Sequence, residues 1–533
     1  MPGYSTISGE GSASAGDMTR HKRARGRQKE AGGGQATMIS SVVNLLNTII
    51  GAGTLAMPSA MSHFGMLIGV FVIVWSGFTS AFGLYLQSRC ARYLDRGSSS
   101  FFALSQMTYP NAAVIFDAAI AIKCFGVAVS YMIIIGDLMP GVAEGFDSRV
   151  ADIPFLMDRN FWITAFMLII IPLSFLRRLD SLKYTSLVAL VAIGYLIVLV
   201  VYHFAADPLA PRDQIRYVSW GGPVEALASL PVVIFAYTCH QNMFSILNEI
   251  SNNSPGSIMG VISSSIGSAA SVYVLVAITG YLTFGNGVDG NIVSMYPPSI
   301  ASTIAKAAIV ILVTFSIPLQ IHPCRASVDA VLKWRPKDVS RPQARTSSPG
   351  GRPLLSTPAQ SRSDHGPTAP ISDLRFAILT TIILVLGYAV ALTVTSLERV
   401  LAYVGSTGST SISFILPGLF YYKISDPNSI HHQRLAKEDD DALSAPGSED
   451  EDEDLDEGLL GRSVESIHSV ASGSSAKSKN TRSLWRWRRK WRWDMEHLTP
   501  NFLRMASLVL AIYGICVMSV CLAMNLVGTV VAH

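Results

Sequence analysis

The chain has 533 residues, of which 50% are hydrophobic and only 15% are charged, with 41 Lys and Arg against 37 Asp and Glu. Soluble domains carry about 25% charged residues, so this chain has too few polar side chains to cover the several soluble domains that its length predicts. The charges also gather in residues 1–36, 325–375 and 423–497. This composition disfavours a soluble enzyme, a nucleic-acid-binding protein and an intrinsically disordered protein. It favours a membrane protein with several spans and polar loops.

Eleven stretches are apolar over about the 20 residues that one helix needs to cross a bilayer. They cover residues 37–60, 65–88, 112–140, 160–176, 183–205, 222–247, 256–282, 302–324, 374–396, 398–422 and 502–528. We therefore expect an all-α membrane protein of about 11 transmembrane helices. The expected segments are a polar tail over 1–36, helices 1–8 over 37–324, a loop over 325–373, helices 9–10 over 374–422, a loop over 423–501 and helix 11 over 502–528.

Basic residues predict the orientation of these spans. Cytosolic loops of membrane proteins are enriched in Lys and Arg, and a cytosolic N-terminus puts the basic clusters at 20–29, 89–96, 177–183, 325–362 and 482–492 on that side. The polar first 36 residues do not resemble a signal peptide. Eleven spans then place the C-terminus on the opposite, lumenal side. The six cysteines form no CxxC pair and lie outside the outer loops, so we expect no disulfide framework, metal or cofactor.

The first span contains residues that interrupt a helix. Its segment from Asn44 to Pro58 reads NLLNTIIGAGTLAMP, with two glycines and a proline. Irregular backbone in the middle of a membrane is tolerated only where it is buried in protein or lines a cavity. Two interpretations stay open here: an unwound stretch near Gly51 and Gly53, or a Gly-x-Gly motif that allows close helix packing.

The sixth span carries a second interruption. Its segment from Pro231 to Ser245 reads PVVIFAYTCHQNMFS, in which a polar cluster from Thr238 to Asn242 divides an apolar stretch. The two interrupted spans are five apart, so ten spans divide into two halves that each begin with an interrupted helix, and the eleventh is an addition. Interrupted segments at corresponding positions of two halves indicate the substrate site of an inverted-repeat transporter.

Such a pair of interruptions predicts a binding site that is built from backbone groups. The N–H groups at the start of the second half of an unwound helix favour an anion, and the carbonyl groups at the end of the first half favour a cation. A zwitterionic amino acid carries both charges. The residues expected at its carboxylate are Gly51, Ala52, Gly53 and Thr54, and those expected at its ammonium are Phe235, Ala236 and Tyr237.

The eighth span offers oxygen atoms for a coupling ion. It contains Thr314 and Ser316, followed by Pro318, whose missing N–H frees a carbonyl group nearby. Together with carbonyl groups of the first span, these hydroxyls can complete a cation site. The alternative is that both hydroxyls bond back to their own helix.

The motifs of these spans resemble the amino acid/auxin permease superfamily. The resemblance rests on NLLNTIIGAGTLAMP in the first span, KCFGVAVSYMIIIGD from Lys123 in the third, Cys239-His240 in the sixth, and Thr314-x-Ser316-x-Pro318 with Pro323-x-Arg325 in the eighth. It covers residues 36–325 well and 374–422 more loosely. Among members, the sequence is most similar to fungal vacuolar amino acid transporters and to animal sodium-coupled neutral amino acid transporters.

The resemblance implies a LeuT-like fold, with a 5+5 inverted repeat, broken helices 1 and 6 and one extra C-terminal helix. It also implies an amino acid carrier that is coupled to a cation or to protons. Animal members bind sodium with a polar residue of helix one and a Thr of helix eight. The residues at those motifs are Asn44, Asn47, Thr314 and Ser316, where we expect Na⁺ or H⁺ as the coupling ion. A vacuolar carrier would run more naturally on protons.

Two ionisable residues inside the spans are further candidates, because a charge in the membrane is costly and indicates a function by default. Lys123 lies in the motif of the third span; the alternative is that it snorkels to the interface or pairs with another helix. His240 lies at the interruption of the sixth span and titrates near neutral pH, which makes it a candidate substrate-site gate or proton-sensitive residue. The alternative is a packing histidine.

Segments outside the spans carry candidate sorting and lipid-binding signals. Tyr4 to Ile7 resembles a tyrosine-based sorting signal, and Asp456 with Leu459 and Leu460 resembles an acidic dileucine signal; both kinds bind sorting adaptors. Residues 482–493 alternate Trp with Lys and Arg next to the last span. This pattern favours contact with membrane lipids over nucleic-acid binding.

We interpret the chain as a secondary active carrier of amino acids in a vacuolar or lysosome-like membrane, exporting to the cytosol, and not as an enzyme. Two alternatives stay open. One is sodium-coupled amino acid uptake at the plasma membrane. The other is an amino acid receptor that signals without transport.

Overall fold

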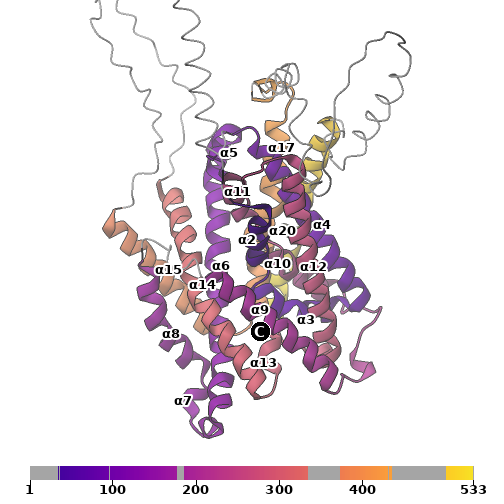
Figure 1. The fold of residues 1–533 in the computed structure, drawn as a ribbon, viewed down its shortest axis with the longest axis vertical. Coiled ribbons are helices and arrows are strands. Elements are labelled where there is room, and N and C mark those ends of the chain that lie inside the picture. Colours follow the sequence, from indigo (N-terminus) through magenta and orange to yellow (C-terminus); the bar gives the residue numbers. More distant parts are fainter. Residues whose placement is uncertain are drawn as a thin grey trace, which may run out of the picture.

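The computed structural model describes residues 34, 36–94, 97–176, 185–333, 372–429, 431–434 and 500–531. The expected sorting and lipid-binding residues, namely Tyr4, Ile7, Asp456, Leu459, Leu460 and 482–493, lie outside this part of the chain. The described residues form a bundle of α-helices (Figure 1). Its helices are α2 (Met38–Ile49), α3 (Ala52–Phe64), α4 (Met66–Ala91), α5 (Phe101–Thr108), α6 (Ala113–Phe146), α7 (Pro154–Met157), α8 (Arg159–Ser174), α9 (Thr185–Ala206), α10 (Pro223–Ala236), α11 (His240–Glu249), α12 (Pro255–Phe284), α13 (Ile292–Met295), α14 (Ile300–Lys333), α15 (Asp373–Thr393), α16 (Leu397–Val404), α17 (Leu416–Ile424) and α20 (Pro500–Val531).

The helices of the described residues fit a multi-pass membrane protein. Eight helical stretches are long and apolar enough to cross a membrane, with α10 and α11 counted together as one, and there are nine if the bent pair α2–α3 also counts as one span. α8 has only 16 residues, which is short for the bilayer core. The tenth expected span is divided into α16, a π-helical stretch (η6, Gly405–Ser409, and η7, Ser411–Ile415) and α17. The set of eleven spans and the 5+5 repeat stay predictions.

One helix continues beyond its expected segment. The eighth span was expected to end at residue 324, whereas α14 continues to Lys333. The ammonium of Lys333 lies 2.7 Å from a carboxylate oxygen of Asp329, one turn earlier, and Arg375 of α15 pairs with the same carboxylate. The pair with Arg375 joins the additional turns of α14 to α15, and the pair with Lys333 lies within those turns, so the loop begins later than its polar composition indicates.

The centre of the bundle is formed by α6 and α14, which have 34 residues each and make the most extensive helix–helix contact in the described structure. α12 packs against both α2 and α3, so one helix supports the interrupted first span on both sides of its bend. α16 packs against α6 and α10.

α2 and α11 are joined at two places. The N–H of Ala36 donates to the carbonyl of Glu249 at 2.9 Å, and the N–H of Ser251 donates back to the carbonyl of Ala36 at 2.9 Å. Further along, the amide nitrogen of Asn242 donates to the hydroxyl of Thr48 at 2.8 Å. The start of α2 therefore lies beside the end of α11.

The two ends of the bundle differ (Figure 1). One end carries α5, the start of α2 and the end of α11, and we call it the α5 end. The other carries α7, α13 and the end of α3, and we call it the α13 end. The interruptions of the first and sixth spans lie between these ends.

Candidate substrate site

The first span is interrupted where the sequence has its two glycines. α2 ends at Ile49 and α3 begins at Ala52, and the pair is bent by 55°. The backbone of Ile50 and Gly51 is extended. Among the described residues, no side chain caps α3, and its first N–H groups lack an acceptor within the helix. The expected interruption is present, and it presents free backbone donors in the middle of the bundle.

The sixth span is interrupted at the expected cluster. α10 ends at Ala236 and α11 begins at His240, which leaves residues 237–239 outside both helices. The N–H of Thr238 donates to the carbonyl of Phe235 at 3.0 Å, and this short-range bond ends α10 in a tight turn. The hydroxyl of Thr238 also donates to the carbonyl of Ile234 at 2.9 Å, whereas the carbonyl of Ala236 has no donor from its own helix.

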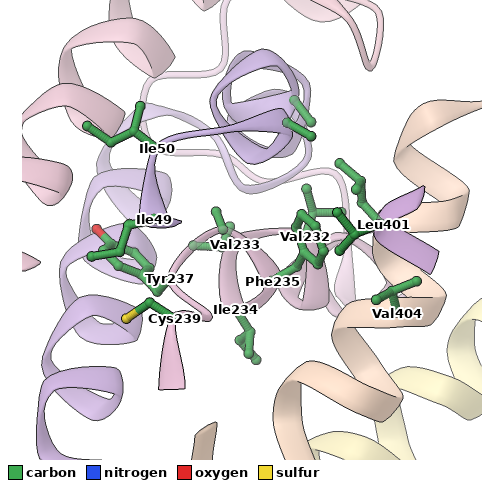
Figure 2. Packing of buried hydrophobic residues seen from close by; sticks show 14 of the residues in the cluster. Ile49, Ile50, Val232, Val233, Ile234, Phe235, Tyr237, Cys239, Leu401 and Val404 are labelled. Atoms are coloured by element: carbon green, nitrogen blue, oxygen red, sulfur yellow. The ribbon is translucent and has the colours of Figure 1, made fainter. Parts of the chain in front are cut away.

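The two interruptions lie against each other. A methyl group built on Gly53 would stand 2.5 Å from the Cβ atom of Ala236, so only glycine lets the backbones of α3 and α10 approach this closely. Figure 2 shows Ile50 and Tyr237 at the two interruptions, with α10 packed beside Leu401 of α16. Both interpretations of the glycines in the first span therefore agree with the structure: the helix is interrupted there, and α3 packs closely against α10.

Tyr273 of α12 holds the two interrupted helices together. Its hydroxyl lies 2.7 Å from the carbonyl oxygen of Ile49 and 2.8 Å from that of Ala236. Both carbonyls end the first half of an interrupted span. A phenol has one hydrogen, so the two acceptors share it, and each keeps a lone pair for another donor. Tyr273 stands in an apolar stretch of the sequence, and no pattern there marks it for this contact.

A cavity of about 530 Å³ lies at both interruptions. Small-molecule sites measure about 300–1,000 Å³. The lining comes largely from α2, α11, the first half of α6 and the last half of α14, with Phe101 of α5, so the cavity extends toward the α5 end. Asp and Glu are absent from its described lining. Its polar residues are Asn44, Asn47, Thr48, Lys123, Tyr131, Thr238, Gln241, Asn242, Ser245, Ser316 and Gln320.

Most residues predicted for the site line this cavity. They are Gly51, Ala52, Gly53, Phe235, Ala236, Asn44, Asn47, Ser316 and Lys123. The amide oxygens of Asn47 and Gln241, which both line the cavity, are buried and have no hydrogen-bond partner in the described part of the chain. A buried acceptor without a partner favours binding of a donor such as an ammonium group.

Four predicted residues lie outside the described lining: Thr54, Tyr237, His240 and Thr314. The ring of Tyr237 packs edge-on against Tyr273, with centroids 5.1 Å apart. The imidazole of His240 faces α4, where a methyl group on Gly83 would stand 2.8 Å from its Nε2 atom, and its carbonyl accepts from Gln87 at 2.9 Å. His240 therefore lies in the packing between α11 and α4, and not at the cavity wall.

A smaller cavity of about 80 Å³ lies between the first interruption, α9 and α14. Asn47 and Ser316 both line it, and the hydroxyl of Ser316 donates to the carbonyl of Leu312 at 2.8 Å, which leaves its lone pairs free for a cation. The hydroxyl of Thr314 donates to Val310 at 2.6 Å and lines neither cavity. Of the expected coupling-ion residues, Asn47 and Ser316 come together here.

Lys123 is a buried positive charge at the wall of the large cavity. It lies in the first half of α6 with 5% of its surface exposed. Gly408 of the π-helical stretch packs against Lys123, because a methyl group on Gly408 would stand 2.9 Å from both the backbone nitrogen and the Cβ atom of Lys123. In the described part of the chain, the cavity wall offers it no carboxylate.

Comparison with known proteins decides the family. The family model of the transmembrane amino acid transporter proteins matches residues 34–440. The chain belongs to this family. Members of the family are transporters, so the protein is not an enzyme.

Named relatives of the family are similar over most of the chain. Vacuolar amino acid transporter 5 of Schizosaccharomyces pombe is 44% identical, over 74% of this chain and 87% of its own length. Vacuolar amino acid transporter 6 of Saccharomyces cerevisiae is 42% identical, over 73% of this chain and 90% of its own length. The sodium-coupled neutral amino acid transporter 7 of Bos taurus is 28% identical, over 56% of this chain and 65% of its own length.

Gly53→Ala should nearly abolish amino acid transport. Its methyl group would separate α3 from α10 at the two interruptions, and moving binding groups by about 1 Å costs about 100-fold in rate. The measurement is amino acid flux in vesicles that hold equal amounts of each variant. Gly267→Ala in α12, where nothing lies within 4 Å of the new methyl group, is the matched control and should transport normally. Normal flux in Gly53→Ala would show that the close contact is not needed.

Ser316→Ala and Thr314→Ala should differ in their response to the coupling ion. Only Ser316 lines the small cavity, and a hydrogen bond to a charged group contributes about 1.5–3 kcal/mol, so Ser316→Ala should weaken the apparent ion affinity by about tenfold or more. Thr314→Ala should leave it nearly unchanged. The dependence of amino acid flux on ion concentration gives the apparent ion affinity of each variant. An effect in Thr314→Ala alone would place the ion elsewhere.

Proposed function

We propose that the chain is a secondary active transporter that moves amino acids from the vacuolar lumen to the cytosol, coupled to protons. One observation carries this proposal: a cavity of about 530 Å³ that reaches the interruptions of both the first and the sixth span. It supports alternate opening of one central site to the two sides of the membrane, which is how inverted-repeat transporters work.

The groups around the cavity match the two charges of a free amino acid. The N–H groups that begin α3, at Ala52 and Gly53, favour the carboxylate because they carry the positive end of the helix dipole. The ammonium group is favoured near the carbonyl of Ala236 and the amide oxygens of Asn47 and Gln241. All of these residues line the cavity.

The lining of the cavity indicates which side of the membrane this state faces. Its lining extends from the interruptions toward the α5 end, which carries the start of α2. A cytosolic N-terminus, as the basic residues predict, makes this the cytosol-facing state. The substrate would then enter at the α13 end from the lumen.

The relatives support the vacuolar membrane as the location, since the two that are 44% and 42% identical are named vacuolar amino acid transporters. An acidic vacuolar lumen supplies a proton gradient toward the cytosol. Protons therefore are the natural coupling ion for export.

Sodium coupling is a second candidate because of one specific feature. Asn47 and Ser316 bring oxygen atoms to the small cavity of about 80 Å³ beside the first interruption, and oxygen ligands suit a hard cation. A relative that is 28% identical is named a sodium-coupled transporter. Sodium-dependent flux without a proton requirement would favour this alternative.

Flux measurements in isolated vacuolar vesicles test the proposed function. Vesicles that contain the protein should release or exchange a panel of labelled amino acids in a manner that depends on an acidic lumen, and a protonophore should abolish net release. Vesicles without the protein are the control. Binding of amino acids without any flux would instead indicate a receptor and contradict the proposal.

A further inference from the structure

One carboxylate joins three helices at the α13 end, on the far side of the interruptions from the cavity. Glu398 lies in the first turn of α16. Its Oε2 atom accepts from the hydroxyl of Ser59 in α3 at 2.7 Å, and its Oε1 atom accepts from the hydroxyl of Ser229 in α10 at 3.0 Å. α3 and α10 are the α13-end halves of the two interrupted spans. Separating them from α16 would break both hydrogen bonds.

His63, in the last turn of α3, lies between two carboxylates of different helices. Its Nε2 atom is 3.3 Å from Oε1 of Glu398, and its Nδ1 atom is 3.6 Å from Oε2 of Glu225 in the first turn of α10. Arg216 approaches the same oxygen of Glu225 at 3.6 Å and donates to the carbonyl of Ser62 at 3.4 Å. We call Ser59, His63, Arg216, Glu225, Ser229 and Glu398 the Glu398 cluster.

The charges of the Glu398 cluster balance only when His63 carries a proton. With a neutral imidazole, the cluster holds two carboxylates and one guanidinium, which leaves one uncompensated negative charge. Two other charged residues lie near the start of α16 and add little charge to the cluster. Asp289 directly precedes Gly290, which contacts Glu398, and Arg399 lies on the exposed side of α16. Both nitrogen atoms of a protonated imidazole can donate, one toward each carboxylate.

The Glu398 cluster is accessible from the surface of the α13 end. The side chains of His63, Glu398 and Glu225 are 30%, 21% and 51% exposed, so protons can reach His63 from that side without crossing the membrane. Histidine changes its charge near neutral pH. These conditions suit a group that responds to the acidity of one compartment.

We propose that His63 is a proton-binding site that controls the opening of the α13 end, and that protonation favours the closed form. The imidazolium ion lies between Glu398 and Glu225 only while α3, α10 and α16 are together. Opening moves it away from at least one carboxylate. A proton therefore binds more tightly to the closed form, and by linkage it shifts the equilibrium toward that form.

This inference rests on the proposed function for its physiological meaning. An acidic lumen at the α13 end would favour closure of that end after substrate has entered, and so favour the form whose cavity extends to the α5 end. Protons would then promote export without binding at the substrate site. Glu398 itself is the partner that holds the proton in place, and Ser59 and Ser229 keep its carboxylate oriented.

Hydrogen–deuterium exchange of the purified full chain in lipid nanodiscs, without substrate, tests the proposal. Exchange in residues 52–64 and 223–236 is compared at about pH 7.5 and about pH 5.5, on either side of the ordinary titration range of histidine and above that of carboxylates. Exchange in α15, residues 373–393, is measured at both pH values as a reference, and it corrects for the chemical effect of pH on exchange. Acidification should slow the corrected exchange in both segments by about two- to fivefold, the range for partly exposed ion pairs.

Variants separate the proton site from general stability. His63→Gln keeps a hydrogen-bonding side chain without a titratable proton and should remove the pH response; Glu398→Gln should remove it too. His203→Gln is the matched control, because His203 near the end of α9 pairs at 2.6 Å with Asp207, the residue directly after that helix, and joins no second helix through this pair. It should respond to pH as the natural chain does. Glu398→Asp, which keeps the charge, should retain part of the response.

Three results would overturn the proposal: no pH response in the natural chain, faster exchange at the lower pH, or an unchanged response in His63→Gln. The readout needs no transport. A pH response without amino acid flux in vesicles would contradict the proposed function but support the proton site. Amino acid flux without this pH response would support the proposed function but contradict the proton site.

Discussion

Backbone groups that are exposed by two interrupted helices set the constraint on which the rest of this structure depends. Unpaired N–H and carbonyl groups in the middle of a membrane are costly unless protein or ligand satisfies them. Here the hydroxyl of Tyr273 lies 2.7 and 2.8 Å from the carbonyl oxygens of Ile49 and Ala236. Gly53 lets α3 and α10 touch at the same level. Residues at both interruptions line a cavity, so the unpaired backbone groups that are costly in a membrane also lie at the candidate binding site.

The two ends of the bundle treat the interrupted helices differently. At the α5 end, α2 and α11 are joined to each other by backbone hydrogen bonds through Ala36 and by the contact of Asn242 with Thr48, and the cavity extends between them and α6. At the α13 end, the halves α3 and α10 are tied to α16 through Glu398. Each end thus holds its halves as a unit. A transporter that opens its ends alternately needs such paired halves.

The positions of the interruptions could be predicted from the sequence because local chemistry sets them. Two glycines within three residues, and a polar cluster within an apolar stretch, are visible in any single span. The cavity-lining role of Gly51, Gly53 and Ala236 followed from the same reasoning. Asn47 and Ser316 also came together as a pair. Local patterns therefore located the two interruptions and several residues that line the cavity beside them.

Contacts between distant spans could not be predicted in the same way. Tyr273 reaches a carbonyl 224 residues away, and Glu398 accepts from a serine 339 residues away; nothing in a single sequence pairs such residues. The direction of a side chain around its helix was also undetermined, which is why Thr314 and His240 were expected at the site although they pack elsewhere. Likewise, the last turns of α14 contain Asp329, which pairs with Arg375 of another helix.

The most direct test of the central claim is an experimental structure of the chain with a bound amino acid, because it locates the two charges of the ligand. We predict the carboxylate within hydrogen-bond distance of the backbone N–H groups of Ala52 and Gly53, with the ammonium near the carbonyl of Ala236. A carboxylate held instead by the side chain of Lys123, away from both interruptions, would contradict a site built from backbone groups.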